Sequence, residues 1–191
     1  MFSHTIDENI VLRLLEERHA EEVFSLLEQN RSHLEMELTW LTDQLSLDDA
    51  KEYIRAGLAR FADNNGLRAG IWRQDRLAGI VSLHSLVRAD RKASLGYWIG
   101  ASFQKQGLVT KSCDSLIAYS FRELKLNRLE IQCDVGNVRS RKVAERLGFT
   151  QEGILRQSWW SRGRFIDMVI YGLLASEWQE RQKGLDTMER P

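Results

Sequence analysis

The stretch that decides the fold is LGYWIGASFQKQGLVTKSCDSL, residues 95–116. An apolar, aromatic run typical of a buried strand comes first, and a helix-like pattern begins near Gly107. The turn between them carries Gln104, Lys105 and Gln106. The first turn of a helix leaves backbone N–H groups unpaired and is the positive end of the helix dipole. The stretch is therefore either an ordinary strand-to-helix turn or a helix N-terminus that holds an anion.

Two features of this turn favour an anion site. Gly107 carries no Cβ, so a phosphate can approach the backbone amides that follow it. Lys105 adds a mobile positive charge, and Thr110 adds a hydroxyl in the first helical turn. The turn matches neither the P-loop, which requires Gly-Lys-Ser/Thr, nor the dinucleotide fingerprint, which requires further glycines. Alone, it leaves both interpretations open.

Composition and charge limit the class of protein. The 191 residues suffice for one domain or two small ones, and 43% hydrophobic with 28% charged residues is typical of a globular protein. Lys plus Arg and Asp plus Glu both number 27, which argues against nucleic acid or a membrane surface as a partner. Two cysteines and four scattered histidines predict no disulfide scaffold and no metal site. The acidic N-terminus, and the lack of an apolar run of roughly 20 residues, predict a cytoplasmic protein.

Hydrophobic periodicity predicts alternating strands and helices. The strands are expected at residues 9–15, 67–73, 77–87, 92–100, 128–135 and on both sides of an Arg162–Gly163 turn. The helices are expected at residues 16–30, 46–64, 107–125 and 138–147. This order predicts an α/β (α+β) fold around one mixed sheet of about seven strands. We expect one domain over residues 1–178 and a polar tail over residues 179–191 that frays.

A second strand-to-helix junction lies at DVGNVRSRKVAERLGF, residues 134–149. Asn137 and Ser140 stand at the start of its helix, and Gly148 is a typical C-terminal cap. Helix capping alone explains each polar residue. Two neighbouring junctions, however, predict a binding cleft, because ligands of open α/β sheets bind beyond the carboxyl ends of the strands.

Together, LGYWIGASFQKQGLVTKS and GNVRSRKVAERLGFTQEG resemble the GCN5-related N-acetyltransferases, known as GNAT proteins. The match is closest to the branch that acetylates the N-terminal residue of ribosomal proteins, and it extends from IVLRLLEERHAEE to IDMVIYGLLASEW. The resemblance implies a mostly antiparallel sheet that splays open in its middle, with helices on both faces. It also implies acetyl-CoA as the cosubstrate, and no metal.

The resemblance implies roles for individual positions. The family's phosphate-loop pattern falls on Gln104, Gly107 and Val109. The implied catalytic groups are Ser140, as a proton donor to the departing thiolate, and a backbone N–H near Ile99, which stabilises the oxyanion. The implied cofactor-binding residues, which hold the pyrophosphate and the pantetheine chain, are Trp98, Ile99, Gln104, Lys105, Gln106, Gly107, Leu108, Val109, Thr110 and Asn137.

Two positions depart from the family pattern. Val109 stands where glycine or alanine is usual, so the phosphate loop is expected to be tighter or slightly displaced. Ser94 stands where many relatives carry a glutamate, so this strand provides no carboxylate base. An α-amine has a pKa of about 7.7–8.0, against about 10.4 for lysine, and it needs a base less. The missing carboxylate therefore favours an α-amine as the acceptor.

The sequence leaves three functions open. They are acetylation of a protein N-terminus, such as that of a ribosomal protein; acetylation of a small amine, such as a polyamine, an amino acid or an aminoglycoside; and a non-catalytic acetyl-CoA-binding module. Trp40 and Trp159 are the candidates for the acceptor side. Cys133 is expected to be a small buried hydrophobe close to the CoA sulfur. The resemblance also implies a homodimer, or a higher homo-oligomer, formed through the C-terminal strands.

Overall fold

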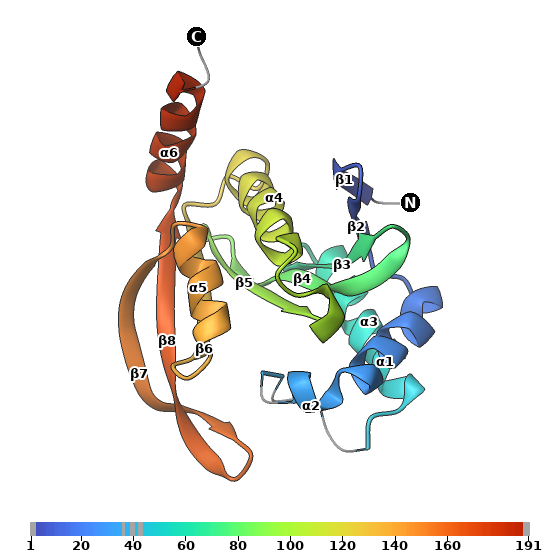
Figure 1. Ribbon diagram of the computed structural model, residues 1–191. Coiled ribbons are helices and arrows are strands. Elements are labelled where there is room, and N and C mark those ends of the chain that lie inside the picture. Colours follow the sequence, from blue (N-terminus) through green and yellow to red (C-terminus); the bar gives the residue numbers. More distant parts are fainter. Residues whose placement is uncertain (1–2, 36, 39–40, 42–43, 189–191) are drawn as a thin grey trace.

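An open sheet of eight strands is the framework of the protein in the computed structural model, which describes residues 3–35, 37–38, 41 and 44–188 (Figure 1). The strands lie in the order β1-β2-β3-β4-β5-β6-β8-β7, and every neighbouring pair except β5–β6 is antiparallel. This confirms the predicted mixed, mostly antiparallel sheet. The strands are β1 (Ser3–Asp7), β2 (Ile10–Leu14), β3 (Leu67–Arg73), β4 (Arg76–Val87), β5 (Lys92–Ile99), β6 (Arg128–Asp134), β7 (Thr150–Ser161) and β8 (Arg164–Leu174).

Helices cover both faces of this sheet. α1 and α3 pack on one face, against β4 and β3, whereas α4 packs on β4 and β5 from the other face, and α5 lies against β6 and β7 (Figure 1). The helices of the described residues are α1 (Ala20–Gln29), α2 (Arg31–Leu34), α3 (Leu47–Ala62), α4 (Leu108–Arg122), α5 (Val138–Arg146) and α6 (Ala175–Met188), with 3₁₀ turns at Glu17–His19 and Ala101–Phe103.

Both ends of the chain differ from the sequence-based expectation. About seven strands were predicted, and the eighth is β1, whose residues SHTID are exposed or half-buried because it is an edge strand paired with β2 alone. Such a strand shows no apolar alternation for a pattern to detect. At the C-terminal end, residues 179–188 continue α6, a helix that the sequence pattern did not predict. The four-residue α2 also lies outside the predicted elements.

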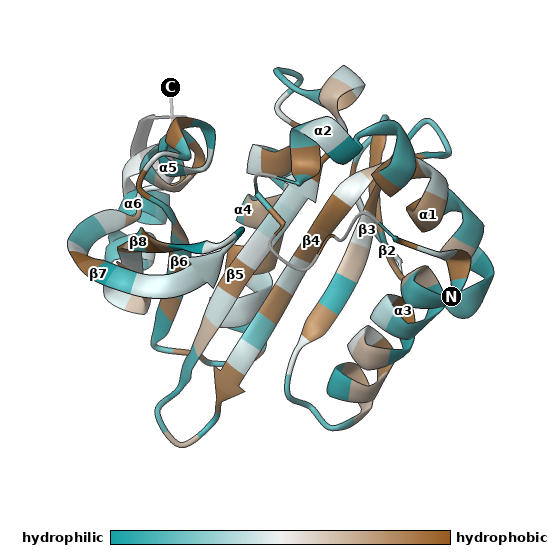
Figure 2. Cartoon of the chain, turned by 90° about the horizontal axis from the view of Figure 1, so that it is seen from below, coloured by the Kyte–Doolittle hydropathy of each residue, from teal (hydrophilic) through white to brown (hydrophobic). Residues whose placement is uncertain are grey.

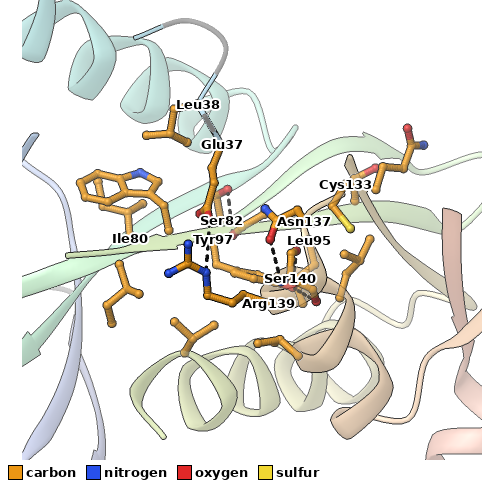
Figure 3. Close-up of a pocket in the computed structure, with 18 of the residues that line it drawn as sticks. Glu37, Leu38, Ile80, Ser82, Leu95, Tyr97, Cys133, Asn137, Arg139 and Ser140 are labelled. Atoms are coloured by element: carbon orange, nitrogen blue, oxygen red, sulfur yellow. Dashed lines mark hydrogen bonds and ion pairs between the residues drawn. The ribbon is translucent and has the colours of Figure 1, made fainter. Parts of the chain in front are cut away.

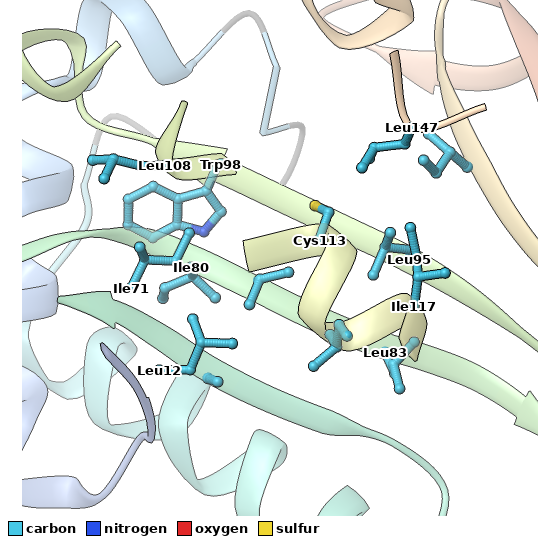
Figure 4. Close-up of a cluster of buried hydrophobic side chains, with 14 of the residues drawn as sticks. Leu12, Ile71, Ile80, Leu83, Leu95, Trp98, Leu108, Cys113, Ile117 and Leu147 are labelled. Carbon is cyan, nitrogen blue, oxygen red and sulfur yellow. The ribbon is translucent and has the colours of Figure 1, made fainter. Parts of the chain in front are cut away.

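The core lies on both sides of the central strands, because their side chains alternate between the two faces. Leu83, Leu95 and Ile117 meet where α4 covers β4 and β5 (Figure 4). On the opposite face, the Trp98 indole Nε1 lies 3.4 Å from the hydroxyl of Tyr53 in α3. Figure 2 shows hydrophobic residues recurring along β4 and β5. The two central strands are therefore packed between both helix layers.

The sheet is divided between β5 and β6. These parallel strands pair over only three residues, Lys92–Ser94 with Arg128–Glu130. Beyond that point β5 follows β4 as far as Ile99, and β6 follows β8 as far as Asp134. The two strands therefore diverge, which confirms the predicted splay in the middle of the sheet.

Local signals determine where the helices begin and end. α3 begins after Ser46, as predicted, and Gly148, two residues after the end of α5, has a φ of +83°. The Gly148 N–H donates to Glu145 O, and the Phe149 N–H donates to Ala144 O, both at 3.0 Å. These two bonds form a Schellman motif, whose left-handed position suits glycine. The predicted C-terminal cap is confirmed.

Replacing Gly148 by alanine is expected to lower the free energy of unfolding by about 1–2 kcal/mol, the cost of a left-handed conformation for an L-residue. The new Cβ would also clash with the Arg181 guanidinium, which must move. Urea unfolding followed by circular dichroism measures the change. Gly153→Ala is the matched control, because that Cβ would meet nothing within 4 Å. A Gly148→Ala protein as stable as the wild type would contradict the assigned cap.

Candidate active site

A cleft of about 1300 Å³ occupies the split between β5 and β6. One half is lined by α5 and the N-terminal end of α4, and the other by α3, β4 and the β7–β8 hairpin. The cleft brings together every predicted site residue except Trp40, which lies outside the described residues. The predicted residues that line it are Trp98, Ile99, Gln104, Lys105, Gln106, Gly107, Leu108, Val109, Thr110, Cys133, Asn137, Ser140 and Trp159.

The N-terminus of α4 offers backbone amides to this cleft. Gly107 is the N-cap residue at a φ of +75°, and no side chain caps the helix. The Lys111 N–H donates to Gly107 O at 3.0 Å, so the amides of residues 108–110 precede the first intrahelical bond. A Cβ on Gly107 would meet nothing within 4 Å, so the space in front of it is open. Val109, the unusual residue of this loop, is half-buried and packs against the core.

A row of basic side chains on α5 faces the same half of the cleft. Arg139, Lys142 and Arg146, hereafter the basic row, recur every three to four residues and lie on one face of the helix. Arg146 Nη1 donates to Thr110 Oγ1 at 3.2 Å, which joins α5 to the first turn of α4. Sequence analysis missed the basic row, although its helical spacing in VRSRKVAER contains the signal. Cations beside helix N-terminal amides form an anion-binding surface.

Two glutamine side chains in the loop before α4 hydrogen-bond to other parts of the protein. The Gln104 amide hydrogen-bonds to His33 Nε2 at 2.7 Å and accepts from Arg139 Nη1 at 3.3 Å. The Gln106 side chain accepts from Arg73 Nη1. Protein partners therefore hold both side chains, and this leaves the backbone amides of the loop to face a ligand.

Hydrogen bonds fix Ser140 at the start of α5. Its N–H donates to Asn137 Oδ1 at 2.9 Å, so Asn137 is the helix N-cap. The Tyr97 hydroxyl lies 3.0 Å from Ser140 Oγ and 3.1 Å from Ser140 O (Figure 3). Burial raises the pKa of Tyr97, so its hydroxyl stays protonated and can donate. Sequence analysis missed Tyr97, because alternation identifies it only as a strand residue next to Trp98.

The two cysteines are both buried, as predicted for Cys133. Cys133, on β6, lines the cleft and is 7% exposed, whereas Cys113, on α4, is fully buried. Burial raises the pKa of both thiols, and a hydrogen bond from Ser140 partly opposes this rise at Cys133. Neither environment activates a thiolate nucleophile.

The edge of β5 that borders the split carries backbone groups with no partner strand. The Gly100 N–H donates to Ala78 O of β4 at 2.9 Å. Because N–H groups alternate in direction along a strand, those of Tyr97 and Ile99 point toward the split, and that of Trp98 points toward β4. The direction of the Ile99 N–H agrees with its predicted role as an oxyanion donor. The direction of the Trp98 N–H does not agree with a contact from this group to a ligand in the split.

Charged and aromatic residues line the other half of the cleft. Glu37 Oε1 lies 4.0 Å from Arg139 Nε and so reaches across the cleft to α5 (Figure 3). Trp159 on β7 is 48% exposed. The β7–β8 turn is joined to the α2 region, since Arg162 Nε donates to Glu35 O at 3.1 Å. Sequence analysis missed Glu37, because its contact joins segments that are far apart in the chain.

In the part of the chain that the structure describes, no three or more His, Cys, Asp and Glu side chains group together as a metal ion would require. None of its helices is both long and apolar enough to cross a membrane. The polar groups that line the cleft include backbone amides, hydroxyls and basic side chains.

The divided sheet, with a helix N-terminus at its opening and two hydroxyl groups at its centre, defines a class of acyltransferase that takes its acyl group from a CoA thioester. The model of the GNAT acetyltransferase domain matches residues 9–150, and the chain belongs to this family of acetyl-CoA-dependent N-acetyltransferases. The fold, the enzyme class and the cosubstrate predicted from the sequence are thereby confirmed.

Several relatives are similar over nearly the whole chain. "Putative ribosomal N-acetyltransferase YdaF" of Bacillus subtilis is 41% identical over 180 residues, which are 94% of this chain and 98% of the relative. The ribosomal-protein-serine acetyltransferase of Escherichia coli is 26% identical over 166 residues, 87% and 93% of the two chains. The solved structure of RimL, a ribosomal L7/L12 α-N-protein acetyltransferase, in complex with CoA is 25% identical with a TM-score of 0.88, covering 92% and 99%. In that structure CoA forms a disulfide with a cysteine.

Proposed function

We propose that the protein transfers the acetyl group of acetyl-CoA to the N-terminal α-amine of a protein, and that this acceptor is a ribosomal protein in the cytoplasm. The observation that carries the proposal is the course of the cleft. It leads from the uncapped N-terminus of α4, through the split in the sheet, to a face lined by α3 and the β7–β8 hairpin. Its volume of about 1300 Å³ exceeds the roughly 300–1,000 Å³ of a pocket for one small ligand, so it has room for two substrates. The relatives named for ribosomal proteins agree with such an acceptor.

The α4–α5 half of the cleft fits the phosphate end of acetyl-CoA. The amides of residues 108–110 and the open space at Gly107 would hold the pyrophosphate at the positive end of α4. Lys105 and the basic row would neutralise the charge of the phosphates. Asn137 uses its side-chain oxygen as a helix cap, which leaves its amide N–H₂ for the pantetheine chain. When bound, acetyl-CoA supplies an acyl group that is already activated as a thioester.

The centre of the cleft provides the groups that acyl transfer requires. The Ile99 N–H would stabilise the developing oxyanion, an effect worth about 2.7–4 kcal/mol per donor in other acyl-transfer sites. Ser140 Oγ would protonate the departing thiolate, while the Tyr97 hydroxyl at 3.0 Å resupplies the proton. Cys133 would lie beside the CoA sulfur, as the disulfide in RimL shows that a cysteine can do in that protein. On the acceptor side we assign Trp159, and Trp40 from outside the described residues.

Deletion of the gene is expected to leave the N-terminus of at least one ribosomal protein unacetylated, because that α-amine loses its catalyst. Mass spectrometry of intact ribosomal proteins from cells with and without the gene measures this. A plasmid copy of the wild-type gene is the control, and it should restore the acetylated mass. Unchanged N-termini, combined with acetylation of a polyamine, an amino acid or an aminoglycoside in a thiol-release assay, would replace the protein acceptor by a small amine.

Gly107→Glu is expected to abolish CoA binding, because the new side chain fills the space in front of the α4 amides and repels the phosphates. Isothermal titration with CoA measures the loss, and a thermal melt confirms that the variant folds. Gly184→Glu is the matched control, since it adds the same charge in open space on α6. Normal CoA affinity in Gly107→Glu would exclude the assigned pyrophosphate site.

We also propose that two copies of the chain pair through β7. This strand is the last of the sheet, so one of its edges offers unpaired backbone groups, and its hairpin with β8 projects from the body of the protein (Figure 1). Every residue of β7 is exposed or half-buried. The large apolar side chains exposed on the hairpin include Ile154, Leu155, Trp160 and Phe165, with exposed fractions of 45–59%. An edge strand with such side chains is suited to pairing with a second copy.

Trp160→Glu is expected to convert this dimer into a monomer, because a carboxylate would be buried in the interface. Sedimentation velocity at micromolar concentration measures the molecular mass. Tyr119→Glu, at a residue that is 40% exposed on α4, is the control and should leave the dimer intact. A wild-type protein that sediments as a monomer would exclude the pairing.

A further inference from the structure

The proposed function leaves unused the one histidine found among the described residues that line the cleft. His84 lies on β4 directly opposite Ser94 of β5, and Ser82 lies opposite Gly96 two residues along. All four residues line the cleft. They share the face on which Trp98 points to α3, because side chains alternate along a strand. His84 therefore lies in the acceptor half, on the strand next to β5.

The His84 ring packs closely over Gly96. A Cβ on Gly96 would lie 3.2 Å from His84 Nε2 and 3.1 Å from Ser82 Oγ, which is tighter than an ordinary contact. The absence of a side chain at Gly96 therefore lets the ring lie against the acceptor face of β5, one residue before Tyr97, where His84 lines the cleft. The other ring nitrogen, Nδ1, lies 3.3 Å from Ser85 Oγ. Within the described residues no hydrogen bond engages Nε2, so this nitrogen is available to a ligand.

The backbone of β4 is irregular at this point. Regular pairing with β5 stops at His84–Ser94 and resumes at Val87–Lys92. Ser85 has a φ of +51°, a left-handed conformation that is costly for a residue with a side chain. β-bulges next to active sites re-aim side chains, and this one begins immediately after His84. The strand therefore departs from regular geometry next to the residue whose side chain packs over Gly96.

The surroundings of His84 keep its imidazole neutral. Burial lowers the pKa of His84, and Arg60 of α3 and Arg68 of β3 lower it further. Arg68 is itself held in place, since its guanidinium lies 3.6 Å from the centre of the Tyr53 ring. A neutral imidazole can accept a proton at Nε2, whereas an imidazolium cannot.

Carboxylates in the same half of the cleft already have partners. Asp49 accepts from the Ser46 N–H at 2.8 Å as part of the α3 capping box. Glu52 lies 4.0 Å from Arg55. Glu37 faces Arg139 across the cleft at 4.0 Å. Among the described residues, these contacts engage carboxylates of this half of the cleft, whereas no hydrogen bond engages His84 Nε2.

We propose that His84 is the general base of the acetyl transfer and that its Nε2 takes a proton from the ammonium group of the acceptor. This assignment rests on the proposed function for the nature of that amine. The freed nitrogen lone pair bonds to the thioester carbon, the C–S bond breaks, and CoA leaves as a thiolate that takes a proton from Ser140. Of the three ammonium protons, one passes through His84 to water, one passes through the Tyr97 hydroxyl to replace the proton that Ser140 gave, and one stays on the amide nitrogen.

The pH dependence of the rate distinguishes a base from a structural residue. His84→Gln is expected to lower kcat/KM by about tenfold at pH 7, because only about a tenth of an α-amine with a pKa of about 7.7–8.0 is neutral at that pH. The loss should shrink toward pH 10, because an α-amine with a pKa of about 7.7–8.0 is then already neutral. A residue that only maintains the fold would lower kcat/KM by the same factor at every pH. Such a uniform loss, or no loss at pH 7, overturns the proposal.

The acceptor used in the assay distinguishes a failure of His84 as the base from a failure of the proposed protein acceptor. The assay uses a peptide with a free N-terminal serine or alanine, and the release of the CoA thiol is followed. If the wild-type enzyme acetylates neither peptide, the protein acceptor fails, and the pH profile is measured with the small amine that it does acetylate. CoA affinity, measured by calorimetry, should be unchanged in His84→Gln.

A second substitution tests the position of the base. Ser94 is directly opposite His84, so the two Cβ atoms are about 4.5–5.5 Å apart and a longer side chain at Ser94 reaches the same part of the cleft. Adding Ser94→His to His84→Gln is expected to restore most of the lost kcat/KM at pH 7. His4→Gln, on the exposed strand β1, is the control for loss of a histidine and should match the wild type.

Discussion

At the base of the cleft, three residues of β5 pair with three residues of β6. This short pairing holds the two halves of the protein together, and the rest of the structure depends on it. β5 meets β6 only at Lys92–Ser94 and Arg128–Glu130, where the Arg128 N–H also donates to Arg91 O at 3.2 Å. Beyond this contact, each strand stays bonded to its outer neighbour, β4 or β8. Because strands in a sheet are rotated relative to one another, two strands that stop pairing diverge. The short pairing therefore opens a cleft in the centre of a sheet without any inserted loop.

The divergence also makes strand backbone available inside the protein. An unpaired strand edge is ordinarily a liability, because its N–H and C=O groups seek partners in other chains. Here the free edge of β5 near Tyr97 and Ile99 lies between the N-terminus of α4 and the start of α5. An extended ligand that enters the split can pair with it as an added strand would. One geometric feature thus provides both the space for a long ligand and free backbone donors beside it.

Sequence patterns predicted what neighbouring residues encode, and they missed what distant residues build. The pattern at residues 67–73 matches β3 residue for residue, and Asn137 and Gly148 cap α5 as expected. β1 went undetected because an exposed edge strand has no apolar alternation. The scattered histidines carried no spacing signal, because the place of His84 beside the cleft follows from the register of β4 on β5. Strand register is decided by packing of whole faces, so a single strand does not reveal it.

The acceptor half of the cleft favours an imidazole over a carboxylate as the base. A carboxylate beside Arg60 and Arg68 would be held ionised, and its ordinary pKa of about 4 lies more than three units below that of an α-amine. An imidazole reduces the gap to about one and a half units, because its ordinary value is about 6.5. Burial and the two arginines lower the pKa of His84, and they also lower the pKa of an ammonium bound beside it. Both shifts have the same sign, so the shift at His84 does not by itself widen the gap between the pKa values of the donor and the acceptor.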